Sequence, residues 1–249
     1  MKTLNEKNVA IVGGSQGIGR EMVRAAAAAG ATVLAVARRA GPLAELAAEI
    51  PGVGTLAADM ADESTPARIF ELMQPDVIVV CGGATPPADS LQEHTWETFS
   101  RVWETDVHGS FNICKAALRA PLAPGATVVL VSSGAGLAGS PISGGYAGAK
   151  RMQMFMAEYA QEESGRHRLG VRFLSLVPRY IMANTAVGKK AAEGYANYRG
   201  ITVEQFLSRF EHPQTVADVA DAFVTLVTEE PARTGTVFAV DGAGITEIP

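Results

Sequence analysis

The sequence predicts an α/β fold, a doubly wound parallel sheet of about seven strands with helices on both faces. Short, mostly β-branched apolar runs alternate along the chain with longer Ala-rich segments of helical character, which is the pattern of right-handed βαβ units. The apolar runs are continuous, so both faces of the sheet should be covered. The 249 residues, 47% of them hydrophobic, can bury one large core without a disulfide or metal. We therefore expect a single domain over 1–249.

Each expected element follows from this alternation. Strands are expected at residues 9–13, 32–37, 54–57, 77–80, 127–132, 171–177 and 237–240. Helices are expected at 17–29, 42–50, 66–73, 96–118, 144–163 and 216–228, and Gly30 suits the end of the first. The segment 179–212 breaks the rhythm because it is long and mixed in polarity. We interpret it as a lid or substrate loop that contains a short helix or two.

Composition and charge exclude several classes of partner and site. The formal net charge is −5 and the basic residues are scattered, so neither nucleic acid nor an anionic membrane is expected as a partner. No apolar segment approaches the length of a membrane span. Cys81 and Cys114 lack ligand or redox spacing, which favours a reducing, cytoplasmic setting. The four histidines lack metal-ligand spacing, and we expect no metal site.

A glycine-rich turn joins the first expected strand to the first expected helix. Residues 9–19 read VAIVGGSQGIG, and glycines 13, 17 and 19 allow a tight turn, close approach of a pyrophosphate, and packing of the helix on the strand. The amino terminus of the helix favours negative charge. We expect this loop to bind a dinucleotide, with Ser15, Gln16 and Ile18 beside the glycines.

A second cluster of polar residues follows the expected strand at 127–132. Tyr146 and Lys150 are four residues apart, so on a helix they share one face, and the lysine charge favours the phenolate. This pairing suits a tyrosine that gives and takes a proton. Ser133 lies thirteen positions before Tyr146, from where its hydroxyl could stabilise charge on the same substrate oxygen.

Together these motifs resemble those of the short-chain dehydrogenase/reductase family, over nearly the whole chain. The shared features are the Gly-x-x-x-Gly-x-Gly loop and the Tyr-x-x-x-Lys pair with its preceding serine. The resemblance implies a Rossmann-type fold and an oxidoreductase that moves hydride between a nicotinamide dinucleotide and a carbonyl or alcohol. It implies that Tyr146 is the general acid/base, that Ser133 polarises the substrate oxygen, and that Lys150 also holds the nicotinamide ribose. It further implies a homodimer or homotetramer, paired through helices 96–118 and 144–163.

The resemblance also implies further cofactor contacts. Asp59 matches the family's adenine-binding aspartate, with Met60 alongside, and Gly82 and Gly83 allow the cofactor to approach closely. Pro178 and Ile181 match positions that lie next to the nicotinamide carboxamide.

Several family positions carry other residues in this chain. Asp106 stands where the fourth catalytic residue is ordinarily an asparagine, whose role rests on a backbone carbonyl in a locally bent helix. The other replacements are Val12, Val80, Cys81, Arg179 and Ala183. Since Arg179 and Ala183 replace a glycine and a threonine near the nicotinamide, Asn184 or Thr185 is expected to take over that contact.

The end of the second strand indicates which dinucleotide is preferred. The strand ends with Arg38 and Arg39, where NAD-binding proteins carry an acidic residue for the ribose 2′-hydroxyl. Two guanidinium groups suit a 2′-phosphate, so we expect NADP(H), with Arg38 as the primary contact and Ser15 as a helper. NAD(H) stays open, because Gln16 replaces a basic residue common in NADP-preferring relatives.

Two alternatives remain from the sequence. One is an NAD-dependent alcohol dehydrogenase of the same family, and the other is a catalytically silent NADPH-binding sensor or scaffold, which the replaced motif positions keep open. Substrate specificity is expected in segments 86–94, 135–145 and 179–212. Four side chains in the last segment hint at a small, apolar carbonyl or alcohol substrate: Tyr180, Met182, Tyr195 and Tyr198.

Overall fold

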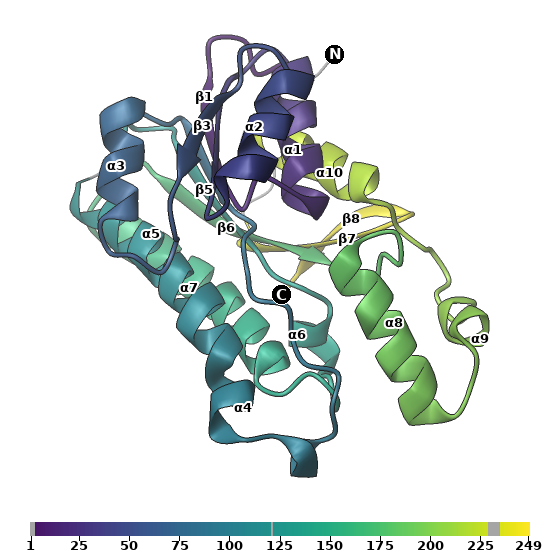
Figure 1. The fold of residues 1–249 in the computed structure, drawn as a ribbon. Helices are drawn as coiled ribbons and strands as arrows, with labels where there is room; N and C mark the ends of the chain where they lie inside the picture. Colours follow the sequence, from purple (N-terminus) through teal and green to yellow (C-terminus); the bar gives the residue numbers. More distant parts are fainter. Residues whose placement is uncertain (1–2, 121, 229–234) are drawn as a thin grey trace.

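The computed structural model describes residues 3–120, 122–228 and 235–249, so the expected span 1–249 includes positions outside this description. One eight-stranded sheet, ordered β3-β2-β1-β4-β5-β6-β7-β8, forms the centre of the molecule (Figure 1). Strands β1 to β7 pair in parallel, and β8 pairs antiparallel with β7. This order confirms the predicted doubly wound α/β fold.

Seven strands agree with the sequence prediction to within a residue or two, and one was not predicted. The strands are β1 (Asn8–Val12), β2 (Thr32–Ala37), β3 (Gly54–Ala57), β4 (Val77–Val80), β5 (Thr127–Val131), β6 (Arg172–Pro178), β7 (Val237–Asp241) and β8 (Gly244–Ile248). The eighth strand lacks a fully buried residue, so it has no apolar run that a pattern search would detect.

Helices follow most strands, as expected for βαβ units. The α-helices are α1 (Gly17–Ala28), α2 (Ala40–Glu49), α3 (Thr65–Leu72), α4 (Trp96–Val102), α5 (His108–Arg119), α6 (Ala135–Ala138), α7 (Tyr146–Arg166), α8 (Ala186–Arg199), α9 (Val203–Leu207) and α10 (Val216–Thr228). A 3-10 turn, η1 (Leu91–Glu93), precedes α4. Across the described ranges, no helix combines the length and the apolar character that crossing a membrane requires.

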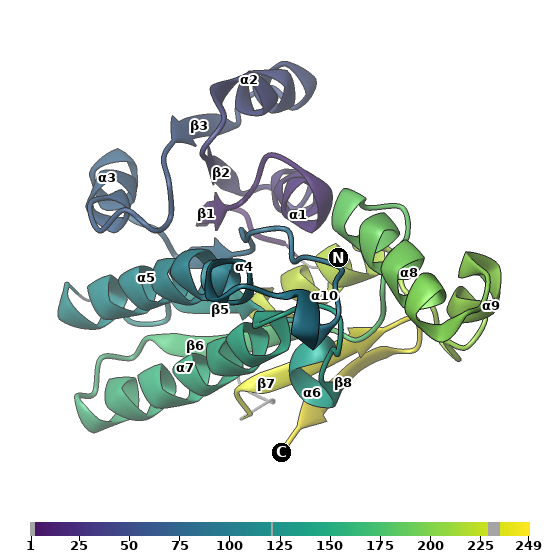
Figure 2. The ribbon, with the colours of Figure 1, turned by 60° about the horizontal axis from the view of Figure 1, so that its bottom comes forward.

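Two apolar layers cover the sheet, one on each face. On one face α1, α2 and α10 pack through Met22, Leu46 and Phe223 against inward residues of the strands. On the other face α3, α5 and α7 pack through Ile69 and Ile113, together with buried residues of α7. Figure 2 shows α3, α5 and α7 on the opposite side of the strands from α1 and α10. Burial on both faces explains why the strand sequences are continuously apolar.

The helix expected over 96–118 is divided into three parts, which corrects the prediction. A π-helical turn, η2 (Trp103–Val107), separates α4 from α5. The wide turn keeps the helical periodicity of the sequence, so the pattern alone does not reveal it. Within it Asp106 is almost completely buried. The local distortion that the family resemblance implied therefore lies at the expected residue.

The carboxyl ends of the parallel strands position the site. The chain leaves β4 toward η1 and α4, β5 toward α6, and β6 toward α8 and α9. These elements gather beyond one edge of the sheet, with α8 and α9 standing away from its centre (Figure 1). The segment 179–212 contains two helices, as predicted, although α8 has 14 residues and is longer than the short helix expected. Ligands of open α/β sheets bind at this edge.

Candidate active site

Two adjoining cavities lie at the carboxyl edge of the sheet and share the Tyr146 side chain. The first, which we call the glycine cleft, has a volume of about 280 Å³. Its lining includes most residues singled out from the sequence: Gly13, Ser15, Gln16, Gly17, Ile18, Gly19, Arg38, Arg39, Asp59, Met60, Gly82, Gly83, Asp106, Tyr146 and Lys150. The second, which we call the α8 pocket, has a volume of about 540 Å³ and is lined by Ser133, Tyr146, Pro178, Ile181 and residues of α8 and α9.

The glycine cleft has the shape that a dinucleotide needs. A Cβ atom at Gly13 would lie 2.3 Å from the Gly82 backbone nitrogen, and one at Gly19 would lie 2.2 Å from the Gly13 carbonyl oxygen. Glycine is thus required where β1, the loop and β4 meet. At Gly17 a Cβ would meet only open space, although the backbone has φ of +56°. No side chain caps the amino terminus of α1, so its first turn is left for an anion, and the residues present fit a pyrophosphate.

Two arginines follow β2 at the mouth of the glycine cleft. Arg39 Nη2 donates to Gln16 Oε1 over 2.8 Å. Gln16, which replaces a basic residue common in NADP-preferring relatives, therefore orients Arg39 and contributes no charge of its own. Arg38 is exposed and makes no ion pair with any acidic residue in the described ranges. The end of β2 therefore offers a cation whose charge no acidic residue in the described ranges neutralises.

The floor of the glycine cleft near β3 is fixed by backbone contacts. Asp59 Oδ1 accepts from the Ala61 backbone N–H over 3.0 Å, and the hydroxyl of Thr65 donates to the Asp59 carbonyl oxygen over 2.6 Å. Asn112, from α5, donates to the Met60 carbonyl oxygen over 3.2 Å. These contacts hold Asp59 and Met60 beside Gly82.

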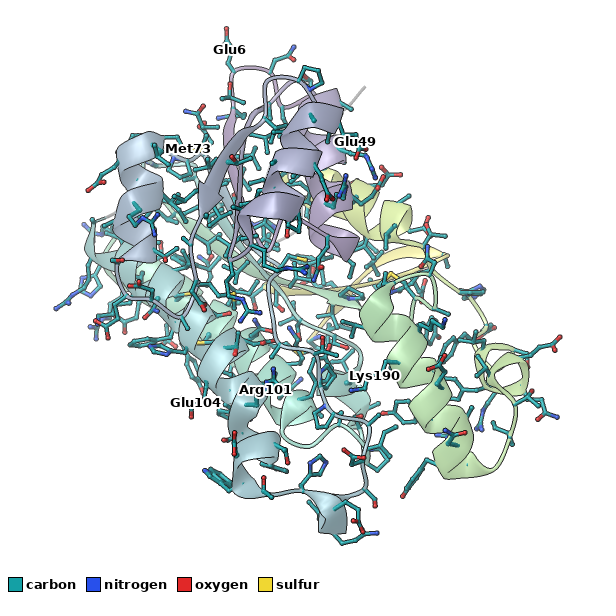
Figure 3. All side chains as sticks on the ribbon, viewed as in Figure 1. Glu6, Glu49, Met73, Arg101, Glu104 and Lys190 are labelled. Atoms are coloured by element: carbon teal, nitrogen blue, oxygen red, sulfur yellow. The ribbon has the colours of Figure 1, made fainter. Side chains whose placement is uncertain are left out.

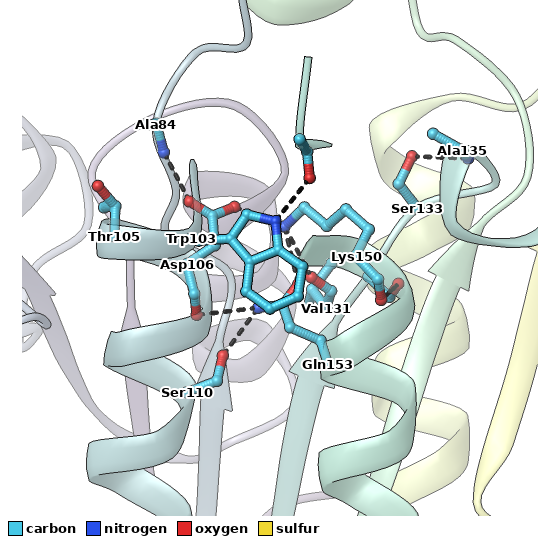
Figure 4. Close-up of polar contacts among 12 residues, drawn as sticks. Ala84, Trp103, Thr105, Asp106, Ser110, Val131, Ser133, Ala135, Lys150 and Gln153 are labelled. Atoms are coloured by element: carbon cyan, nitrogen blue, oxygen red, sulfur yellow. Dashed lines mark hydrogen bonds and ion pairs between the residues drawn. The ribbon is translucent and has the colours of Figure 1, made fainter. Parts of the chain in front are cut away.

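Below Tyr146 lies a buried ion pair. Lys150 Nζ is 2.9 Å from Asp106 Oδ2, and the two side chains are 7% and 1% exposed. Asp106 Oδ1 also accepts from the Ala84 backbone N–H over 2.8 Å. Figure 4 shows the two side chains pointing toward each other between neighbouring helices. The lysine also donates to the Val131 carbonyl oxygen over 3.3 Å, so it is fixed beneath the phenol ring, 5.6 Å from the ring centre.

This environment keeps Lys150 charged. Burial lowers the pKa of Lys150, but the negative charge of Asp106, together with Tyr146 and Cys81, more than compensates, and the pKa lies above its ordinary value. The ammonium group is therefore retained at neutral pH in a place where few ions are buried.

Two serines follow β5 and have different positions. Ser133, partly exposed, lines the α8 pocket with Tyr146, and its oxygen accepts from the Ala135 N–H over 3.3 Å. Ser132 is buried and donates to the Lys150 carbonyl oxygen over 2.6 Å, which ties α7 to the end of β5. Ser133 is thus available to a ligand, while Ser132 is structural. The phenol and the Ser133 hydroxyl share one pocket, and the ammonium lies in the adjoining cleft.

Comparison with known proteins agrees with this geometry. The family model described as short chain dehydrogenase matches residues 7–195, well over half of the chain. The chain belongs to the short-chain dehydrogenase/reductase family. It is therefore an oxidoreductase that acts on a carbonyl or alcohol group with a nicotinamide dinucleotide.

Curated relatives within the short-chain dehydrogenases are moderately similar over nearly their full length. Carbonyl reductase [NADPH] 2 of Sus scrofa is 25% identical over 90% of each chain, and L-xylulose reductase of Bos taurus is 27% identical over 93% of each chain. A 2,5-dichloro-2,5-cyclohexadiene-1,4-diol dehydrogenase of Sphingobium indicum is 29% identical over 100% of each. A solved short-chain type dehydrogenase/reductase of Mycobacterium ulcerans shares the fold with a TM-score of 0.78 at 21% identity, covering 98% of this chain and 93% of that one.

The end of β6 departs from the short-chain dehydrogenase pattern, and the structure distinguishes the two residues expected to compensate. Thr185 lines both cavities, whereas Asn184 is exposed and lines neither. The Thr185 hydroxyl caps α8, since it accepts from the Gly188 N–H over 3.0 Å and donates to the Met182 carbonyl oxygen over 2.9 Å. Of the two, Thr185 is placed to contact a ligand.

Sequence reasoning missed three residues that hold the short-chain dehydrogenase site together. Gln153 is fully buried, accepts from Lys150 Nζ over 3.0 Å and donates to the Ser110 hydroxyl over 2.8 Å. Trp103 donates from its indole nitrogen to the Gly145 carbonyl oxygen over 3.0 Å, at the start of α7. Gln153 lies three residues after Lys150 and therefore shares its helix face, which was the available signal. No group of three or more potential metal ligands occurs within the described ranges.

Proposed function

We propose that this protein is an NADP(H)-dependent reductase or dehydrogenase of small carbonyl or alcohol substrates, with Tyr146 as general acid/base. One observation carries the proposal: Tyr146 lines both cavities, and Ser133 lines the α8 pocket beside it. A substrate oxygen in that pocket can thus contact two hydroxyl groups at the edge of the cleft that suits the cofactor. Lys150 lies buried beneath the phenol.

Each side chain has a distinct task in reduction. When bound, the reduced cofactor would supply hydride for the carbonyl carbon, and the remaining tasks fall to the chain. Tyr146 gives its phenolic proton to the carbonyl oxygen as the C=O π bond breaks, so the product is an alcohol. Ser133 donates a hydrogen bond to the same oxygen while negative charge develops on it. Lys150 stabilises the tyrosinate left behind, and oxidation uses the same groups in reverse.

Asp106 has a positioning task in this proposal. Its carboxylate fixes Lys150 by the 2.9 Å contact and offsets part of the lysine charge. Asp106 thereby replaces the asparagine expected from the family pattern, and it acts through Lys150 rather than on the substrate.

The uncompensated charge of Arg38 supports the NADP(H) preference. A 2′-phosphate would supply the anion that the described acidic residues do not, and Arg38 and Arg39 both line the cleft. One relative is named a carbonyl reductase with NADPH. Gly13, Gly17 and Gly19 would hold the pyrophosphate, Asp59 and Met60 the adenine end, Gly82 and Gly83 the central part, and Pro178, Ile181 and Thr185 the nicotinamide end.

We propose that residues 1–249 act as one cofactor-binding and catalytic domain, assembled as a homodimer or homotetramer in the cytoplasm. Aromatic side chains stand exposed on the two helices expected to pair: Phe111 on α5 is 48% exposed and Tyr159 on α7 is 56% exposed. Packing α5 and α7 against a second copy would cover them. Analytical ultracentrifugation of Phe111→Glu tests this, since a mass equal to the unaltered protein would contradict it.

Both described cysteines are free thiols, which suits a reducing compartment such as the cytoplasm.

The decisive experiment separates chemistry from cofactor binding. Tyr146→Phe should lower turnover of a broad carbonyl panel with NADPH by about a thousandfold and leave NADPH affinity unchanged, because only the transferable proton is lost. Tyr159→Phe, on the exposed face of the same helix, is the matched control and should keep full activity. Unchanged turnover in Tyr146→Phe contradicts the assigned role. Tight NADPH binding with no turnover of any carbonyl favours a sensor instead.

A further inference from the structure

The α8 pocket carries an unexpected excess of positive charge. Four basic side chains line it, namely Arg179, Lys190, Arg199 and Arg209, and none of the described residues lining it is Asp or Glu. Figure 3 shows Lys190 on the side of α8 that faces the body of the molecule. For a chain with a net charge of −5, a pocket whose described charged residues are all basic is a local reversal of the overall charge.

Within the described ranges, three of these cations lack an acidic partner. Lys190, Arg199 and Arg209 make no ion pair with any acidic residue in the parts of the chain that the structure describes. Arg179 makes a loose pair of 3.8 Å with Asp241. The first three side chains are exposed at the pocket and can therefore receive an anion.

Two of the cations, Lys190 and Arg199, lie at increasing distance from the reacting end of the pocket along α8. Thr185 and Val187, at the start of α8, line both cavities, whereas Arg199 is the last residue of α8 and lines the α8 pocket alone. The twelve-residue separation of Val187 and Arg199 corresponds to about 18 Å along a helix axis. The α8 pocket therefore extends from the Tyr146 end along much of the helix.

An aromatic cluster connects the end of β6, α8 and α9 along the wall of the α8 pocket. Tyr195 stacks on Phe206 with ring centres 5.2 Å apart, Phe206 meets Phe210 edge to face at 5.5 Å, and Tyr180 stacks on Phe210 at 4.8 Å. The Arg199 guanidinium lies 5.8 Å from the Phe206 ring centre, and Arg209 directly precedes Phe210. The cluster thus holds α9 against α8 and places both arginines on a structured wall.

From this arrangement we infer that the substrate is an elongated carbonyl or alcohol compound with a carboxylate or phosphate group distant from the reacting carbon. Arg199 and Arg209 bind the anionic group, Lys190 lies along the path, and apolar residues such as Ile142 and Phe206 contact the connecting chain. This deepens the proposed function and rests on it. A wholly apolar substrate, which the Tyr- and Met-bearing loop suggested from sequence, would leave these cations without a partner.

Matched substrates test the inference. Unbranched aldehydes that end in a carboxylate, in a series of chain lengths, are compared with their methyl esters at saturating NADPH. We expect the preferred acid to have a kcat/KM about tenfold above its ester, a difference of about 1.4 kcal/mol, because the ester lacks the charge-assisted contacts of the anion. The preference should appear in KM, vary with chain length and fall with added salt. Terminal phosphates in place of carboxylates distinguish the two anion types.

Variants locate the effect. The double variant R199Q/R209Q should remove the preference for the acid while the kcat/KM of the ester stays within twofold, on the order expected for surface changes. K189Q is the matched control, because Lys189 neighbours Lys190 on α8 but does not line the pocket. Calorimetric titration of the NADP⁺-loaded protein with acid and ester supplies a second readout. Equal binding and turnover of the two, or binding of neither, overturns the inference. Turnover of the ester alone overturns it while leaving the proposed function intact.

Discussion

The two cavities that meet at Tyr146 are built in different ways. The glycine cleft is shaped by backbone, since a single carbon added to Gly13 would collide with Gly82, and one added to Gly19 would collide with Gly13. The α8 pocket is shaped by side chains, and its wall is an aromatic cluster from residues far apart in sequence. A backbone-built site tolerates few residues and therefore leaves a pattern in the sequence, whereas a side-chain-built pocket can be formed in many ways. The glycine cleft can therefore be recognised from a sequence motif, whereas the α8 pocket cannot.

The largest effect on the glycine cleft is expected from a substitution at Gly13. Gly13→Ala places a Cβ 2.3 Å from the Gly82 backbone nitrogen, on a backbone with φ of +87°. We expect a loss of about 3 kcal/mol in the free energy of unfolding, together with a fall in NADPH affinity of at least about a hundredfold. Urea denaturation and cofactor titration measure the two effects.

The control for Gly13 is a glycine with open space around it. A Cβ at Gly41, in the first turn of α2, meets nothing within 4 Å. Gly41→Ala should leave cofactor affinity unchanged and raise stability slightly, by up to about 1 kcal/mol. If Gly13→Ala behaved like Gly41→Ala, the glycine cleft would not be a backbone-built site.

Charge at the far end of the cleft gives the next largest effect. Arg38→Asp should move the ratio of NADPH to NADH affinity by about a hundredfold toward NADH, because the carboxylate repels a 2′-phosphate and can accept from a 2′-hydroxyl. Fluorescence titration with both cofactors measures the ratio. Arg101→Asp, an equal charge change on exposed α4 (Figure 3), should leave it unaltered. An unchanged ratio of NADPH to NADH affinity in Arg38→Asp would mean that Arg38 does not determine the preference for NADP(H).

What the sequence predicts follows the same division. The strands and α1 agree closely with prediction, because a buried strand must be apolar throughout and Gly30, with φ of +93°, suits a helix end. The spacing of Ser133, Tyr146 and Lys150 was enough to place them near one another. The strand β8 escaped prediction because it is only partly buried, and η2 because a π turn leaves the periodicity almost unchanged.

Tertiary contacts account for what the sequence could not predict. Asp106 was expected to serve through its backbone, yet its carboxylate meets Lys150 directly, an outcome that depends on how η2 packs against α7. The stacking of Tyr180 on Phe210 joins residues thirty positions apart, and no local pattern specifies it. The basic residues of the α8 pocket come together only because tertiary contacts, such as Tyr195 stacking on Phe206, bring α9 to α8.

Asp106→Asn tests the buried ion pair with Lys150, which lies where the two cavities join. A lysine whose pKa is raised on folding contributes stability that is fully present below its ordinary pKa and is lost as pH rises through the folded value. Without the carboxylate, burial lowers the pKa of Lys150 instead. We expect Asp106→Asn to cost about 2 kcal/mol near neutral pH, with the difference from the unaltered protein shrinking at alkaline pH.

The same variant should alter the pH profile of activity. Without Asp106, burial lowers the pKa of Lys150, so the ammonium that stabilises the tyrosinate is lost at lower pH, and alcohol oxidation should begin to fall at a lower alkaline pH than in the unaltered protein. Glu104→Gln, an exposed carboxylate of the same π turn (Figure 3), should leave stability and profile unchanged. An alkaline limb that does not move would mean that Asp106 is not what keeps Lys150 charged.

The smallest expected effect is a difference in labelling between the two thiols, because Cys81 faces the glycine cleft and Cys114 does not. Burial raises the pKa of Cys81 to about 11 and that of Cys114 to about 12, so both should react slowly at pH 8, where only about one Cys81 thiol in a thousand is ionised. Cys81 lines the glycine cleft, whereas Cys114 is a residue of α5 that is buried in the core. In Cys114→Ser, saturating NADP⁺ should slow labelling of Cys81 several-fold. In Cys81→Ser, labelling of Cys114 should be insensitive to the cofactor except through global stability. Equal protection of both thiols would mean that the cofactor acts by stabilising the fold rather than by occupying the cleft beside Cys81.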